Sequence, residues 1–144
     1  MGRILAIDYG QKRVGIAVSD ELQLIANGLC TVPAKEIFSF LKTYLANEKV
    51  ELFVVGEAKT LNNTASSASS YIEPFVKKLT SLYPEIPIVR IDERFTSKIA
   101  FQTMIDIGLS KKARRNKALI DTISATIILQ SYMESKDIVK QYTN

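Results

Sequence analysis

Residues 3–20 read RILAIDYGQKRVGIAVSD, a pattern that predicts the start of a β-sheet. It holds two apolar runs of β type, residues 3–9 and 14–18, joined by a polar segment in which Gly10 can adopt a positive φ. The two runs therefore predict an antiparallel hairpin. A third β-leaning run over residues 22–32 extends the hairpin to a three-stranded meander, which Pro33 ends.

Downstream of the meander, apolar spacing alternates between helical and strand patterns. The expected elements are a helix over residues 35–48, a strand over 52–56, a loop over 61–70, a helix over 72–82, a strand over 87–91, a helix from about 97 to 107 and a long helix over 117–135. Pro74 is expected in the first turn of its helix or at a kink. The order predicts an α/β fold with a central mixed five-stranded sheet, three antiparallel strands followed by parallel strands, flanked by helices.

The composition fits one globular domain. The chain has 144 residues, of which 47% are hydrophobic and 24% charged, and we expect a single domain over residues 1–137 with a polar tail over 138–144. The N-terminus meets Asp8 too early to form the apolar core of a signal peptide. A single cysteine, Cys30, predicts a buried small side chain and a reducing, cytoplasmic location.

The absence of histidine restricts the chemistry. It excludes Ser-His-Asp and Cys-His catalysis and His-ligated zinc, which leaves carboxylates with a hard metal ion, or a lysine or tyrosine base. The net charge of +4 and the pI of about 9.2 modestly favour a polyanionic partner such as nucleic acid.

Three carboxylates stand at positions that favour a site. Asp8 ends an apolar strand, where it is either a functional carboxylate or a polar exit into the turn at Gly10. Asp121 is the only charged residue between Lys117 and Glu134 on an apolar helix, and we expect its face to be shielded from solvent, although a helix dipole also favours an aspartate there. Glu93 directly follows a strand, where a solvated loop is the alternative.

Together these carboxylates predict a site for Mg²⁺ or Mn²⁺ and phosphodiester hydrolysis, because such ions prefer oxygen ligands and need no histidine. The Asp8-Tyr9-Gly10 motif also occurs in the phosphate hairpin of actin-like ATPases and sugar kinases. Those proteins clamp nucleotide between two domains and are more than twice as long, which disfavours this alternative.

Three segments resemble the motifs of the bacterial YqgF family, also called RuvX-like. They are residues 4–20 (ILAIDYGQKRVGIAVSD), residues 92–97 (DERFTS), and residues 117–121 (KALID) running into 124–130 (SATIILQ). The resemblance implies a ribonuclease H-like fold related to Holliday junction resolvases, with Asp8, Glu93 and Asp121 as the acidic triad. It also implies processing of the 5′ end of the 16S ribosomal RNA precursor in the cytoplasm.

One position departs from the family pattern. Where the family has Gly-Leu-Pro after the fourth strand, this chain has Gly56-Glu57-Ala58. Glu57 is either a further metal neighbour or a solvated loop residue. The polar loop that follows, through Ser70, is a candidate cover for the substrate groove.

Positive charge adjoins each carboxylate in the sequence. Lys12, Arg13, Arg94 and Lys117 are predicted phosphate contacts, although a solvated basic face would look the same. The candidates for base stacking are only Tyr9 and Phe95, so recognition of the nucleic-acid backbone and shape fits better than base reading.

Three functions remain open. The first is a nuclease acting on pre-rRNA, with the small ribosomal subunit precursor as partner. The second is a Holliday junction resolvase acting on structured DNA. The third is a non-catalytic nucleic-acid-binding factor for ribosome assembly or transcription. No apolar stripe beyond the core is evident, so we expect a monomer or a weak homodimer.

Overall fold

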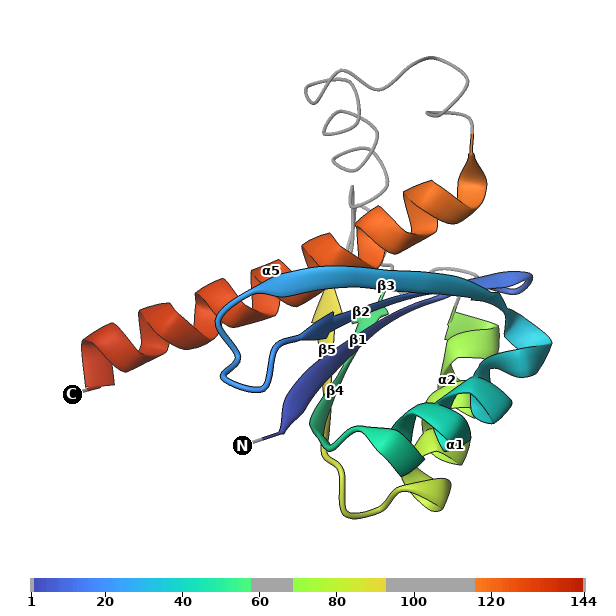
Figure 1. The fold of residues 1–144 in the computed structure, drawn as a ribbon, viewed down its shortest axis with the longest axis horizontal. Coiled ribbons are helices and arrows are strands. Elements are labelled where there is room, and N and C mark those ends of the chain that lie inside the picture. Colours follow the sequence, from blue (N-terminus) through green and yellow to red (C-terminus); the bar gives the residue numbers. More distant parts are fainter. Residues whose placement is uncertain (1, 58–68, 93–115, 144) are drawn as a thin grey trace.

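The computed structural model describes residues 2–57, 69–92 and 116–143, which form a five-stranded sheet with helices on both faces (Figure 1). The strands are β1 (Arg3–Tyr9), β2 (Arg13–Ser19), β3 (Ala26–Pro33), β4 (Val50–Glu57) and β5 (Ile88–Asp92). The helices are η1 (Ala34–Glu36), α1 (Ile37–Asn47), α2 (Ser69–Leu82) and α5 (Lys117–Thr143). The spatial order is β3-β2-β1-β4-β5, antiparallel from β3 to β1 and parallel from β1 to β5, which confirms the predicted mixed sheet.

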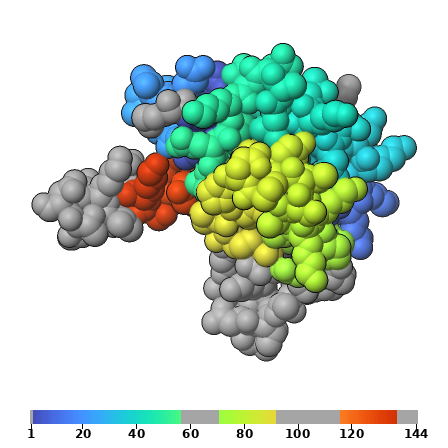
Figure 2. Space-filling view, turned by 90° about the horizontal axis from the view of Figure 1, so that it is seen from below, coloured from blue at the N-terminus to red at the C-terminus, as the bar shows by residue number. Residues whose placement is uncertain are grey.

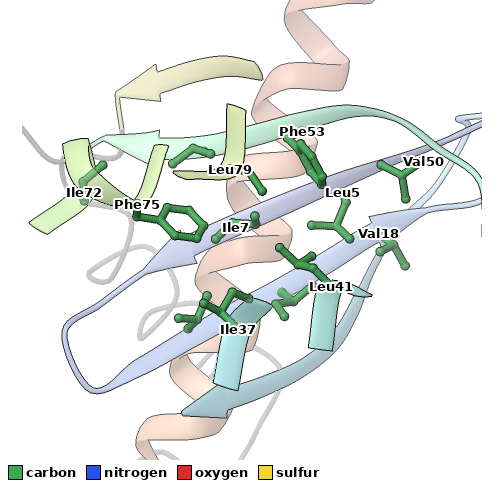
Figure 3. Close-up of a cluster of buried hydrophobic side chains, with 13 residues drawn as sticks. Leu5, Ile7, Val18, Ile37, Leu41, Val50, Phe53, Ile72, Phe75 and Leu79 are labelled. Atoms are coloured by element: carbon green, nitrogen blue, oxygen red, sulfur yellow. The ribbon is translucent and has the colours of Figure 1, made fainter. Parts of the chain in front are cut away.

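Alternation along the strands divides the core between the two faces of the sheet. Leu5 and Ile7 of β1 pack with α1 and α2, in the cluster that Figure 3 shows together with Phe53 of β4. Ile4 and Ala6 point to the other face and pack against α5. Figure 2 looks onto the face where α1 and α2 lie next to each other. Because side chains alternate, Asp8 follows Ala6 onto the α5 face.

Two glycines allow α5 to lie close to the sheet. A Cβ on Gly15 of β2 would come closer than 3.0 Å to the main-chain oxygen of Asp121, a separation that real Cβ atoms essentially never show. A Cβ on Gly28 of β3 would lie 2.7 Å from the Cγ2 methyl of Thr122. The helix backbone therefore rests directly on β2, and its position depends on the missing side chain at Gly15.

The third strand begins later than expected, at Ala26 rather than at Leu22. The carboxylate of Asp20 accepts hydrogen bonds from the main-chain N–H groups of Leu22 (3.2 Å), Leu24 (2.7 Å) and Ile25 (2.8 Å). Gln23 takes a left-handed conformation with a φ of 59°. The segment therefore forms a turn, because a side-chain acceptor competes with the sheet for these donors.

Two helices are longer than predicted: α2 begins earlier and α5 ends later. α2 begins at Ser69, so Pro74 lies inside the helix rather than in its first turn. Ile72 is buried, and the ring of Tyr71 lies 6.0 Å from that of Tyr9. α5 continues past its expected end at Ser135 to Thr143, over residues expected to form a tail, since no glycine or proline interrupts it there. The helix expected over 97–107 and the loop before α2 up to residue 68 lie outside the described residues.

Cys30 and membrane association can also be compared with the expectations. Cys30 is half-buried and packs against the core beneath α1 and α2, and burial raises the pKa of its thiol, which disfavours the reactive thiolate. Within the described ranges, no helix combines the length and hydrophobicity that a bilayer crossing demands.

The turn at Asp20 predicts an acid-sensitive contribution to stability. Hydrogen bonds to the carboxylate, first that from Ile25, lower the pKa of Asp20 below its ordinary value of 3.8. The stabilisation is therefore present above that value and is lost as the pH falls through the lowered pKa of the folded state. We expect Asp20→Asn to flatten the acid limb of the stability curve, measured by urea unfolding between pH 5 and pH 2. Glu36→Gln, which changes an exposed carboxylate elsewhere, should leave that limb unchanged.

Candidate functional site

A pocket of about 310 Å³ lies where β1 ends and α5 begins. Its lining residues are Asp8, Gly10, Gln11, Lys12, Arg13, Lys117 and Asp121. The structure thus brings together two predicted carboxylates and three predicted phosphate contacts. Glu93 and Arg94, the other predicted site residues, lie outside the described residues, as does Phe95.

Gly15 is the structural link between the two carboxylates. It pairs with Asp8 across the β1–β2 ladder, and the main chain of Asp121 rests on its bare Cα. Asp8 and Asp121 therefore meet on one face of the sheet, although they lie at opposite ends of the chain. Sequence reasoning missed this role of Gly15; a glycine inside an apolar strand is the signal that could have indicated a close backbone approach.

The start of α5 is attached to β3 by side-chain hydrogen bonds. Thr31 Oγ1 donates to the main-chain oxygen of Ala118 (2.7 Å) and lies 2.7 Å from Thr122 Oγ1. Asn116 caps the helix, because its Oδ1 accepts from the N–H of Leu119 (3.2 Å). These contacts fix the turn that carries Asp121. An asparagine before an apolar helix could have indicated the cap, whereas nothing in the sequence singled out Thr31.

Thr31→Val should therefore loosen the start of α5 without changing the shape of the side chain much. We expect a loss of about 1 kcal/mol in the free energy of unfolding, since the change removes the hydrogen bonds of Thr31 Oγ1 to the start of α5. Thr126→Val is the matched control, because Thr126 Oγ1 donates within the helix, to the oxygen of Thr122. Amide hydrogen exchange of residues 117–122 measures the effect; equal exchange rates in the two variants would contradict it.

An ion pair joins the two sides of the pocket. Arg13 Nε donates to Asp121 Oδ2 at 2.7 Å, with the Asp121 side chain 22% exposed and that of Arg13 40% exposed. The predicted shielding of Asp121 is therefore partial. α5 is likewise covered on one side only, since its fully buried described residues are confined to one stripe: Ser124, Ala125, Ile128 and Leu129. The pairing of Arg13 with a carboxylate was not foreseen.

The two lysines of the pocket are exposed. Lys12 and Lys117 line it from the hairpin turn and from the first residue of α5. Tyr9, a candidate for base stacking, points to the opposite face, where its ring stacks on Phe75 with a centroid distance of 4.2 Å. In the described part of the chain, the pocket thus offers charge rather than aromatic surface.

Two of the three predicted ligands of a hard divalent cation line the same pocket. Asp8 and Asp121 offer the carboxylate oxygens that such a cation prefers, whereas a group of three or more acidic, cysteine or histidine side chains that could hold a metal is absent from the described residues. The carboxyl ends of β1, β4 and β5 meet at the same edge of the sheet, where Glu57 pairs in register with Asp92. Glu93 is the next residue after Asp92, so this edge is where the chain leads into the third predicted carboxylate.

Proteins similar to this chain are known by sequence and by fold. A protein of Flavobacterium johnsoniae named "Putative pre-16S rRNA nuclease" is 57% identical over 94% of this chain and 99% of its own. A protein of the same name from Bacteroides thetaiotaomicron is 59% identical with the same coverage. The structure of T. thermophilus RuvC in complex with a Holliday junction substrate shares the ribonuclease H-like fold, with a TM-score of 0.52 and 18% identity over 94% of this chain and 98% of that one. A family model described as RuvX, Holliday junction resolvase, matches residues 2–135, and the chain belongs to this family.

Proposed function

We propose that this protein is a cytoplasmic, divalent-metal-dependent nuclease that hydrolyses phosphodiester bonds in the 16S rRNA precursor. The observation that carries the proposal is the pocket in which Asp8 and Asp121 meet beside Lys12, Arg13 and Lys117. Membership of the RuvX family and the name of its relatives in Flavobacterium and Bacteroides support both the reaction and the substrate.

In this proposal Asp8, Glu93 and Asp121 hold Mg²⁺ or Mn²⁺. Bound there, such ions activate water and stabilise the leaving oxygen of a phosphodiester. Two of the carboxylates stand on regular elements, a central strand and a helix, which keeps their separation constant. Glu93 is included because it directly follows β5, whose last residue is in register with the end of β4.

The exposed lysines complete the site by binding phosphates next to the scissile bond. Lys12 and Lys117 flank the carboxylates from two elements, and Arg94 would add a third charge beside Glu93. Because the aromatic ring of Tyr9 is used in packing on α2, we expect recognition of the RNA backbone rather than of its bases. Affinity should then fall steeply as salt rises.

The test is cleavage of a 16S precursor fragment and of a four-way DNA junction in Mg²⁺ or Mn²⁺. We expect cleavage of the RNA and loss of cleavage in Asp8→Asn, Glu93→Gln and Asp121→Asn. Glu85→Gln, an exposed carboxylate far along the chain from the pocket residues, is the control and should retain activity. Undiminished cleavage in all three carboxylate variants would refute the carboxylate mechanism.

The same assay separates the alternatives. Cleavage of the junction in preference to RNA would identify a resolvase, which the family description and the RuvC-like fold keep as the second candidate. RNA binding without cleavage of either substrate would identify a binding factor instead.

A further inference from the structure

Arg13 occupies the place where a cation would be expected. Its guanidinium lies 2.7 Å from Asp121 Oδ2, one of the two carboxylates proposed to hold the metal. A positive group at this oxygen neutralises part of the charge that two neighbouring carboxylates would otherwise concentrate in the pocket. The arginine thus does for the metal-free protein what a divalent cation would do when bound.

The main chains of both partners of this ion pair are held in place. The main chain of Asp121 is held against Gly15, and the same turn of α5 is attached to Thr31. The main chain of Arg13 is fixed as well, since its oxygen accepts from the N–H of Gly10 (3.0 Å) and the residue pairs with β3. The long Arg13 side chain, 40% exposed, is therefore the element that can change position.

We propose that Arg13 is an exchangeable counter-ion: it holds Asp121 in the metal-free protein and transfers to a phosphate of the RNA when a divalent cation takes its place. This inference rests on the proposed function. A guanidinium matches carboxylate and phosphate oxygens with the same planar fork, so the exchange preserves its hydrogen bonding. A single ion pair in contact with solvent is weak, so a divalent cation can displace this one, whose side chains are 40% and 22% exposed.

The exchange makes the binding of metal and the binding of RNA cooperative. Each cation that binds releases a guanidinium for phosphate, and each phosphate that captures the guanidinium frees an oxygen of Asp121. By linkage, RNA must raise the affinity for metal by the same factor as metal raises the affinity for RNA. Arg13 is thus a positioning residue that couples the two ligands.

The first experiment follows the Nε–H resonance of Arg13 by ¹⁵N NMR while Mg²⁺ is added to the intact protein without RNA. The peak is assigned by its absence in Arg13→Lys. We expect it to move to the position of an unpaired arginine as Mg²⁺ saturates the site, and to stand there from the start in Asp121→Asn. A peak that stays in place while other pocket resonances report bound Mg²⁺ would overturn the exchange but leave the metal site intact.

The second experiment measures Mn²⁺ affinity by calorimetry. Arg13→Gln should bind Mn²⁺ about two- to fivefold more tightly than the natural protein, as expected for the loss of one competing exposed ion pair. Lys12→Gln is the matched control, because it removes a charge from the same pocket without, among the described residues, an ion pair to Asp121. An equal gain in Mn²⁺ affinity in both variants would show that any loss of positive charge in the pocket has this effect, and would overturn the exchange. Absence of Mn²⁺ binding in every variant would instead refute the proposed function.

Discussion

Asp8→Asn should abolish the stabilisation that Mg²⁺ or Mn²⁺ gives to the protein and lower the rate of cleavage by at least about 100-fold. Changes to groups that merely orient metal ligands already cost roughly 10- to 100-fold, so loss of a proposed ligand should cost more. The amide keeps the shape of the side chain at the end of β1 but removes its charge. The effect is therefore expected on metal binding and not on the fold.

Thermal unfolding with and without metal provides the measurement. A ligand at 100 times its Kd stabilises a protein by about 2.7 kcal/mol, which should raise the Tm of the natural chain visibly. The Tm of Asp8→Asn should not respond to metal, whereas that of Glu85→Gln should respond fully. A metal-dependent rise of equal size in Asp8→Asn would show that Asp8 is not a ligand.

Gly15→Ala is expected to give the second large effect, a loss of about 1–3 kcal/mol in the free energy of unfolding together with most of the nuclease activity. The added methyl would meet the main-chain oxygen of Asp121, which cannot rotate away. Strand and helix would have to separate, and the two carboxylates would separate with them.

Gly28→Ala is the matched control on the neighbouring strand. There the new methyl would meet side-chain atoms, Thr122 Cγ2 at 2.7 Å and Thr126 Oγ1 at 3.0 Å, at larger separations than that from the main-chain oxygen at Gly15. Urea unfolding and the cleavage assay should both rank Gly15→Ala as the more severe change. If both variants behave like the natural protein, the close packing of α5 on β2 is not required for the site.

The part of the fold that could be predicted depends on local runs and spacings of apolar residues. The continuous apolar runs over residues 4–7 and 14–18 became β1 and β2, which are covered on both faces of the sheet, and the apolar stripe of α2 faces the core as expected. The ends of strands and helices were less predictable, because they depend on hydrogen bonds between side chains and main-chain groups. Leu22, Leu24 and Ile25 suggest a strand, yet they are 65%, 72% and 61% exposed in the turn closed by Asp20.

The sequence predicted which residues line the candidate site, but not which of them contact one another. Asp121 stood out as an isolated charge on an apolar helix, and Asp8 as the exit from a strand. The pairing of Arg13 with Asp121 and the role of Gly15 between the carboxylates arise from chain segments more than a hundred residues apart. Such pairings follow from the docking of α5 on the sheet, which no local pattern encodes.

The alternation of β1 has a consequence for how this protein can vary. Asp8 and Tyr9 are neighbours, but one lines the pocket and the other packs beneath α2. An insertion or deletion of a single residue within β1 would exchange them, placing an aromatic ring at the site and a carboxylate in the core. An insertion or deletion of an even number of residues in β1 therefore keeps the carboxylate on the side of the pocket, whereas an odd number removes it from the site.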